Sequence, residues 1–168
     1  APSQHLLSDW MTQWLQTYAK NAIKPSTYIS YEGYIYNHIN PALGGYPIQQ
    51  ITTPMVQEFY NQKFQSGSKK GGGLSPKTLR NMHNMFHQAM EQARINGMIA
   101  VNPTDGTTLP RREQNEMRVL SLEEERQLLS VIGMHRLGMA ILFDLATGLR
   151  IGELCALKWS DINFQKAD

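Results

Sequence analysis

The chain has 168 residues, 41% of them hydrophobic, and carries a formal net charge of +2. Such a length suits one or two small domains, and no apolar run is long enough to cross a membrane. The single cysteine, Cys155, excludes an internal disulfide framework and a cysteine-rich zinc site, and this composition suits a reducing cytoplasm. Cys155 lies on an apolar helix face, which predicts a buried thiol.

The charge is unevenly distributed along the chain. Residues 1–118 hold 11 Lys and Arg against 7 Asp and Glu, whereas residues 119–168 hold 5 against 7. A mildly basic front part is compatible with DNA binding but does not establish it.

The first hundred residues show almost wholly helical patterns. Residues 3–20 place apolar side chains on one stripe, and a second helix is expected from Pro25 to residues 40–41. A third helix opens at Thr53 with proline after it, and a flexible loop follows at 65–73. The fourth and longest helix is predicted over 76–96.

A polar stretch, residues 104–118, separates this part from a second helical part. Ser121 and Glu124 have the spacing of a capping box, and helices are expected at about 121–132, 136–147 and 150–157. A strand is expected to begin at Asp161, and a strand without a partner is not stable. We therefore predict a domain at 1–103, a linker at 104–118 and a truncated domain at 119–168.

Two of the predicted helices begin with the same pattern of residues. Proline stands at the first helical position and threonine two residues later, and the residues concerned are Lys24, Ser26 and Thr27 in one helix and Lys77 and Thr78 in the other. A lysine and a hydroxyl beside free backbone N–H groups suit a DNA phosphate, but the same pattern also makes an ordinary helix start. The sequence leaves both interpretations open.

The fourth helix has one apolar and one polar face. The apolar stripe is expected in the core and consists of Leu79, Met82, Phe86, Ala89, Met90 and Ala93. The opposite face mixes cations with amides and comprises Lys77, Arg80, Asn81, Asn84, His87 and Gln88. Asn and Gln pair with adenine edges, and Asn is a mediocre helix former for a merely solvated helix face, so the pattern favours DNA recognition.

The most informative segment is residues 146–162. An apolar run ends at Gly148, and Arg150 follows where a new helix begins. Free N–H groups at a helix start favour an anion, and a guanidinium offers two donors to phosphate oxygens. Glu153 lies one turn on and is placed to brace Arg150, although such pairs are also common on exposed helices.

This segment resembles the first conserved arginine box of the tyrosine recombinases, the phage integrase family. The match runs through Thr147, Gly148, Arg150, Glu153, Leu154, Leu157, Trp159, Asp161 and Ile162. The resemblance implies a mainly α chain: a four-helix SAM-like core-binding domain followed by a truncated, mostly helical start of the α+β catalytic domain. In that family the residue matching Arg150 contacts the scissile phosphate.

The resemblance also implies partners and chemistry. The family acts on core-type sites in double-stranded DNA through a covalent 3′-phosphotyrosine intermediate, without metal or other cofactor, and needs no membrane. The complete recombinase is expected to be a tetramer on DNA, and this piece a monomer. All seven tyrosines precede Arg150, and no histidine follows His135. Of the catalytic set, only Arg150 matches a position here, with Glu153 as its support.

We therefore expect a recombinase fragment that binds DNA without cutting it. Two alternatives remain open. One is a non-catalytic DNA-binding regulator derived from the family, and the other is a helical protein-interaction module whose polar faces are merely solvated.

Overall fold

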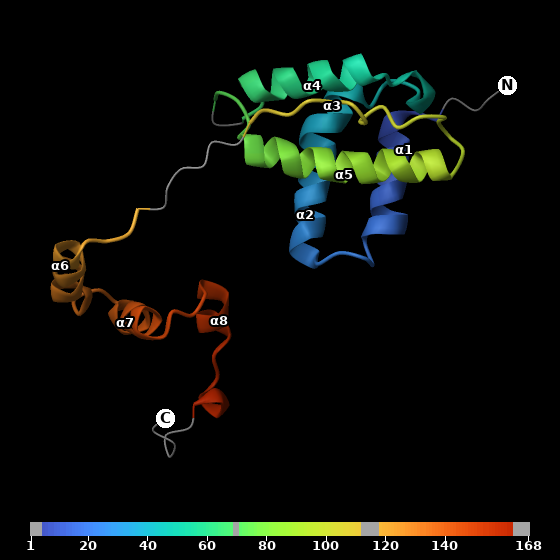
Figure 1. Ribbon diagram of the computed structural model, residues 1–168. Coiled ribbons are helices and arrows are strands. Elements are labelled where there is room, and N and C mark those ends of the chain that lie inside the picture. The colour runs from blue at the N-terminus through green and yellow to red at the C-terminus, as the bar shows by residue number, and fades with distance from the viewer. Residues whose placement is uncertain (1–4, 69–70, 112–117, 163–168) are drawn as a thin grey trace. The chain divides into compact units, whose positions relative to one another are not determined.

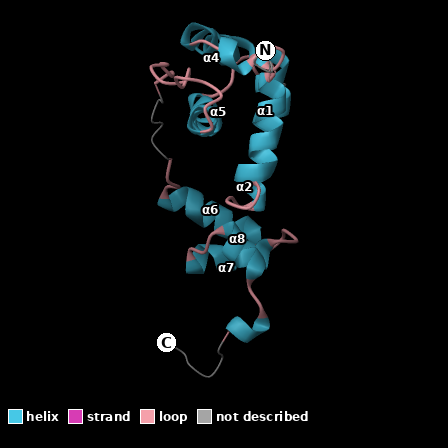
Figure 2. Ribbon diagram, turned by 90° about the vertical axis from the view of Figure 1, so that its right-hand side faces the viewer, coloured by secondary structure: helices cyan, strands magenta, loops and turns pink. Residues whose placement is uncertain are grey.

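The computed structural model describes residues 5–68, 71–111 and 118–162. The chain divides into two compact units, Ala1–Gln114 and Asn115–Asp168 (Figure 1). Helices connected by loops make up both units, and the described residues include no strand (Figure 2). The prediction of a mainly α chain is confirmed. Among the described residues, no helix combines the length and hydropathy that crossing a membrane requires.

Two long antiparallel helices form one side of the first unit. Helix α1 (Leu7–Trp14) continues through a π-helical turn (Leu15–Ala19), and α2 (Pro25–Tyr34) continues through a second one (Ile35–Ile39) into the short α3 (Asn40–Leu43). Pro25 starts α2 because its fixed φ suits the first helical position, where no intrahelical N–H bond is lost.

Two further helices complete the first unit. A 3-10 turn (Ile48–Gln50) leads into α4 (Thr53–Ser66), and a loop leads into α5 (Pro76–Ile95). Helix α5 packs across the α1–α2 pair with α4 running alongside it (Figure 1). Gly73 is required in the connecting loop because a Cβ there would collide with the carbonyl oxygen of Phe64.

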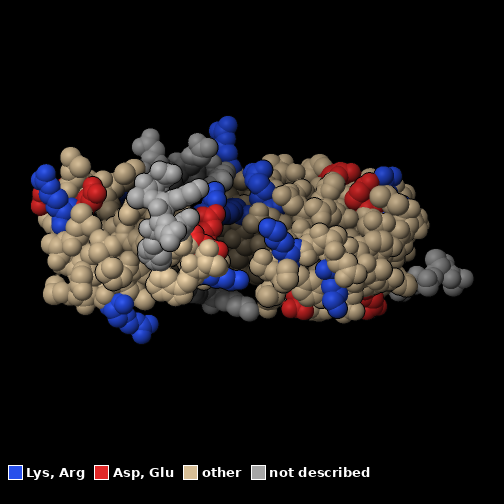
Figure 3. Space-filling model, turned by 90° about the horizontal axis from the view of Figure 1, so that it is seen from below, with Lys and Arg blue, Asp and Glu red and all other residues tan. Residues whose placement is uncertain are grey.

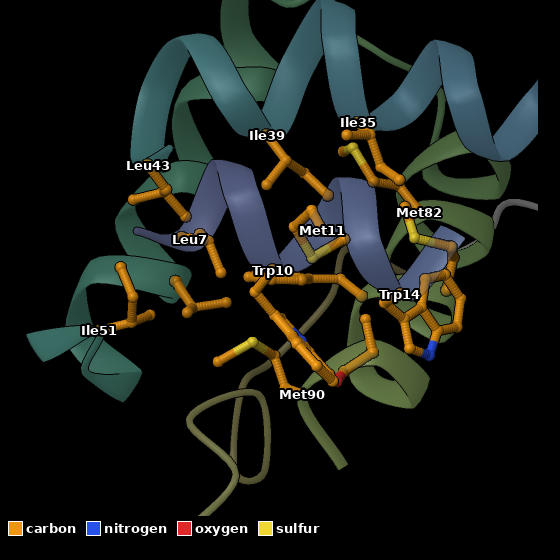
Figure 4. Packing of buried hydrophobic residues seen from close by; sticks show 14 of the residues in the cluster. Leu7, Trp10, Met11, Trp14, Ile35, Ile39, Leu43, Ile51, Met82 and Met90 are labelled. Carbon is orange, nitrogen blue, oxygen red and sulfur yellow. The ribbon is translucent and has the colours of Figure 1, made fainter. Parts of the chain in front are cut away.

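The predicted apolar stripe of α5 lies entirely in the core of the first unit. Each of its six residues has no exposed surface. The stripe meets Leu7, Trp10 and Met11 of α1 together with Ile35 and Ile39, and Figure 4 shows Trp10 beside Met90. The buried indole Nε1 of Trp10 donates a hydrogen bond to the backbone oxygen of Ala89 at 3.0 Å. This bond joins α1 directly to the middle of α5.

The segment after α5 also packs on the first unit. Asn102 and Thr104 are buried, and Asn102 donates to the backbone oxygen of His87 on α5 at 3.2 Å. Gln57 of α4 accepts a hydrogen bond from the N–H of Thr108 at 2.7 Å and donates to its oxygen at 3.0 Å. The first residues of the stretch expected to be a linker, 104–118, are thus held against α4 and α5.

The second unit contains α6 (Leu122–Ile132), α7 (Gly138–Thr147), α8 (Ile151–Ala156) and a 3-10 turn (Trp159–Asp161). The predicted capping box is present, since Glu124 accepts from the N–H of Ser121 at 2.9 Å and donates its own N–H to the Ser121 hydroxyl. Of the hydrophobic side chains in the described part of this unit, Ile132 alone is buried, whereas Met134, Met139 and Trp159 are at least 80% exposed.

Two local predictions in this unit are wrong. Cys155 is exposed, because α8 packs against α7 without a further layer over its apolar face among the described residues. Asp161 does not begin a strand; it ends the 3-10 turn and accepts a hydrogen bond from the N–H of Lys158 at 3.0 Å. Residues 163–164 of the expected strand lie outside the described part of the chain.

The α1–α5 contact can be tested by replacing its donor. Trp10→Phe keeps an aromatic ring but removes the hydrogen bond to Ala89 and leaves space beside Met90, so the free energy of unfolding is expected to fall by about 1–3 kcal/mol. Trp159→Phe, at an 82% exposed position, is the matched control and is expected to change stability by less than ~0.5 kcal/mol. Urea unfolding followed by circular dichroism measures both. Equal effects of the two substitutions would contradict the structural role of Trp10.

Candidate nucleic-acid interface

Helices α2 and α5 enclose an open groove on the surface of the first unit. Its volume is about 430 Å³, and it is lined by Ser26, Thr27, Ser30, Tyr31, Tyr34, Asn81, Asn84 and Gln88. Five of these were predicted as DNA-contacting residues from their positions on two separate helices. The structure brings them to one place, which we call the α2–α5 groove.

The amides of the α2–α5 groove are free of internal partners. Within the described part of the chain, no side-chain hydrogen bond engages Asn81, Asn84 or Gln88. The fourth amide of α5, Gln92, lies outside the groove and donates to Asn96 at 3.0 Å. The groove amides therefore keep both donors and acceptors available for a ligand.

Three aromatic or hydroxyl residues of the groove were not predicted as ligand contacts. Ser30, Tyr31 and Tyr34 line it beside Ser26 and Thr27, one to two turns further along α2. Burial, followed by the nearby Tyr34, raises the pKa of Tyr31, so its hydroxyl stays protonated and able to donate at neutral pH. Ser30, Tyr31 and Tyr34 follow Thr27 by three, four and seven residues, and this helical spacing is the signal that places them on the same helix face.

The two lysine-bearing helix starts differ in how their N–H groups are satisfied. Ser75 caps α5 by accepting the N–H of Thr78 at 3.1 Å, and its hydroxyl also lies 2.9 Å from that of Thr78. Lys24 is the N-cap residue of α2 and provides no side-chain cap. The hydroxyl of Thr78 thus already has a structural partner, whereas Lys24, Lys77 and Arg80 are exposed.

Charge on the first unit is sparse. Figure 3 shows Lys and Arg side chains standing apart on a largely uncharged surface. Glu91, the acidic residue on the polar face of α5, pairs with Arg94 through a bond of 2.7 Å between Arg94 Nη2 and Glu91 Oε1. The hydrogen bond from Arg94 lowers the pKa of Glu91, and that carboxylate is therefore compensated within α5.

His87 has a partner within the protein. Its Nε2 lies 3.0 Å from Oδ1 of Asp105, a residue of the segment that packs on α5. The neighbouring His83 contacts the hydroxyl of Tyr60 through Nδ1 at 3.2 Å. Burial, with His87 and Arg80 nearby, lowers the pKa of His83, and Asp105 opposes that shift. The histidines therefore join α4, α5 and the 102–109 segment, and His87 does not line the groove.

Arg150 and Glu153 lie in the second unit at the start of α8. Gly148 ends α7 with φ of +64°, a conformation that glycine adopts without strain, and Arg150 becomes the N-cap residue of α8. The carboxylate of Glu153 accepts from the N–H of Arg150 at 2.8 Å and from its Nη1 at 3.2 Å. The guanidinium is 87% exposed, so its remaining donors are available to an anion. No set of His, Cys, Asp and Glu within the described ranges is placed to hold a metal ion.

Comparison with known proteins identifies relatives of the whole chain. Residues 6–64 match the family described as phage integrase, N-terminal SAM-like domain. A protein named tyrosine recombinase XerC-like, from Caldanaerobacter subterraneus subsp. tengcongensis, is 33% identical over 96% of this chain. The alignment spans only 42% of that relative's length.

Solved structures of similar proteins show the same fold. The solution structure of a phage integrase SAM-like domain from Moorella thermoacetica is 34% identical, with a TM-score of 0.53, and covers 70% of this chain and 95% of its own. A lambda integrase tetramer bound to a Holliday junction is 25% identical, with a TM-score of 0.79, and covers 95% of this chain and 45% of its own.

The lowered pKa of His83 predicts a specific loss of stability in mild acid. The unfolded state takes up a proton near pH 6.5, whereas folded His83 resists protonation until a lower pH, so the free energy of unfolding falls as the pH drops below about 6.5. His83→Gln is expected to remove this part of the loss, and His5→Gln, at an exposed position, to retain it. Urea unfolding between pH 5 and 8 measures the difference, and an unchanged profile in His83→Gln would contradict the assignment.

Proposed function

Because the chain belongs to the tyrosine recombinase (phage integrase) family, we propose that it forms the core-site DNA-binding part of a site-specific recombinase. Residues 1–103 are the core-binding domain, residues 119–168 begin the catalytic domain, and residues 104–118 connect the two. The complete enzyme breaks and rejoins DNA strands through a 3′-phosphotyrosine intermediate during DNA integration or recombination.

The α2–α5 groove is the observation that supports this proposal. Its lining offers hydroxyls and unpaired amides without any Asp or Glu, and the exposed cations Lys24, Lys77 and Arg80 stand at or near the starts of the same two helices. Phosphate contacts from such cations position a protein on DNA, while amides read base edges. The related lambda integrase is seen bound to a DNA junction, which is consistent with a DNA partner for this chain.

The second unit contributes Arg150. In the proposed recombinase its guanidinium contacts the scissile phosphate, and Glu153 holds it in place at the start of α8. The nucleophilic tyrosine has no counterpart among residues 151–168. The 168-residue chain is thus proposed to bind DNA, to be monomeric without it and to be inactive in cleavage, with tetramers formed by the complete recombinase on DNA.

The salt dependence of binding tests the proposal. Lys77→Ala is expected to weaken binding to all duplexes alike and to reduce the slope of log affinity against log salt by about one unit, because one phosphate contact is lost. Lys63→Ala makes the same charge change on α4, where the ammonium lies 5.7 Å from the ring centre of Phe59. A duplex titration at several salt concentrations compares both variants with the parent protein. An equal slope change in both, or no salt-dependent binding by the parent, would overturn the proposal.

Arg150→Ala distinguishes a phosphate contact from a structural role. The Arg150–Glu153 pair is exposed, and such pairs contribute about 0–1 kcal/mol, so the helical circular dichroism and unfolding midpoint are expected to stay nearly unchanged. Affinity for DNA is expected to fall modestly, because the first unit provides most of the contacts. Arg126→Ala on α6 makes the same charge change away from α8. Unfolding of the second unit in Arg150→Ala alone would assign Arg150 a structural role instead.

A further inference from the structure

The α2–α5 groove contains no charged side chain, and this limits which bases it can read. Its polar groups are hydroxyls and amides, and Tyr31 and Tyr34 are the aromatic residues of its lining. Guanine is recognised most often by Arg or Lys, which donate to both O6 and N7. A groove without cations lacks that pair of donors, whereas an amide offers one donor and one acceptor.

We propose that the α2–α5 groove reads closely spaced A·T base pairs in the major groove, with Asn84 and Gln88 on adenine edges. This inference rests on the proposed DNA-binding function and names the bases that the groove recognises. A side-chain amide accepts from adenine N6 and donates to N7, so a single residue satisfies both atoms. Asn84 and Gln88 have no competing side-chain partner among the described residues, so they lose no internal hydrogen bond when they engage a base.

The spacing of the amides along α5 matches a short run of base pairs. Asn81, Asn84 and Gln88 lie at intervals of three and four residues and therefore share one face of the helix. At a rise of about 1.5 Å per residue they extend over about 10 Å along the helix axis, which corresponds to about three base-pair steps of 3.4 Å. Because three steps join four base pairs, the A·T preference should appear at two or three positions within a run of about four base pairs.

The α2 side of the groove supplies the complementary contact. Tyr31, Tyr34 and Thr27 are half-buried and line this side, so two aromatic rings and a residue that carries a methyl group are found there. The C5-methyl of thymine projects into the major groove and is recognised by apolar contact. Adenine edges then face α5 and thymine methyl groups face α2. The groove is therefore expected to bind each A·T pair in one orientation.

Selection from a random duplex pool tests this inference with the 168-residue chain. Sequencing of the bound fraction is expected to show two or three A·T pairs within a run of about four base pairs. Asn84→Ala should abolish the preference at one of them and weaken binding to the selected site by roughly 5- to 150-fold. Alanine is a better helix former than asparagine at this exposed position, so the variant is expected to fold. Asn61→Ala on α4 removes an amide outside the groove and should leave the selected sequence unchanged.

Modified bases distinguish the hydrogen bond from other causes of the preference. In 7-deazaadenine, N7 is replaced by carbon, so its use at the Asn84-dependent position should weaken binding by the parent protein while Asn84→Ala shows no further loss. Uracil in place of thymine removes the methyl group and should weaken binding at the positions facing α2.

The possible failures separate the two proposals. Selection of G·C pairs at the positions lost in Asn84→Ala, or salt-dependent binding without any selected sequence, would overturn the A·T assignment and leave DNA binding intact. No salt-dependent binding at all would overturn the proposed function itself.

Discussion

The hydrogen bond from Trp10 to the backbone oxygen of Ala89 fixes the arrangement on which the first unit depends. Breaking α1 away from α5 would leave a buried indole N–H without a partner, and an unpaired buried donor costs about 1–3 kcal/mol beyond the lost packing. The π-helical continuation of α1 packs against α2, α1 packs against the continuation of α2, and α2 contacts α5 directly. The α2–α5 groove therefore follows from the packing of these three helices.

Helix α5 contributes to both the core and the groove. Its apolar stripe is buried in the core, and its polar face carries both side chains without internal partners among the described residues and side chains that are hydrogen-bonded within the protein. Asn81, Asn84 and Gln88 remain available at the groove, whereas His83 and His87 connect to Tyr60 and Asp105. The two histidines thus link α5 to α4 and to the 102–109 segment, while the groove amides share one helix face through their spacing of three and four residues.

Helix boundaries and core residues were predictable because they follow from local rules. The six-residue stripe of α5, the proline starts and the Ser121–Glu124 capping box all depend on residues within one or two turns. The α2–α5 groove was predicted only in parts, since no periodicity shows that Tyr34 of α2 faces Asn84 of α5. The contact between His87 and Asp105 was not predictable either, because Asp105 lies 18 residues away in the stretch expected to be a linker.

The exposure of the Cys155 thiol was not predictable for the same reason, because burial also depends on contacts with other elements of the fold. A helical stripe predicts burial only if another element covers it, and the described residues of the second unit bury little more than Ile132. Arg150 depends less on such packing. Its backbone turn comes from Gly148, and its orientation comes from two hydrogen bonds to Glu153 within the same turn of helix. A local motif can thus hold an arginine ready for an anion even where the surrounding apolar surfaces remain uncovered.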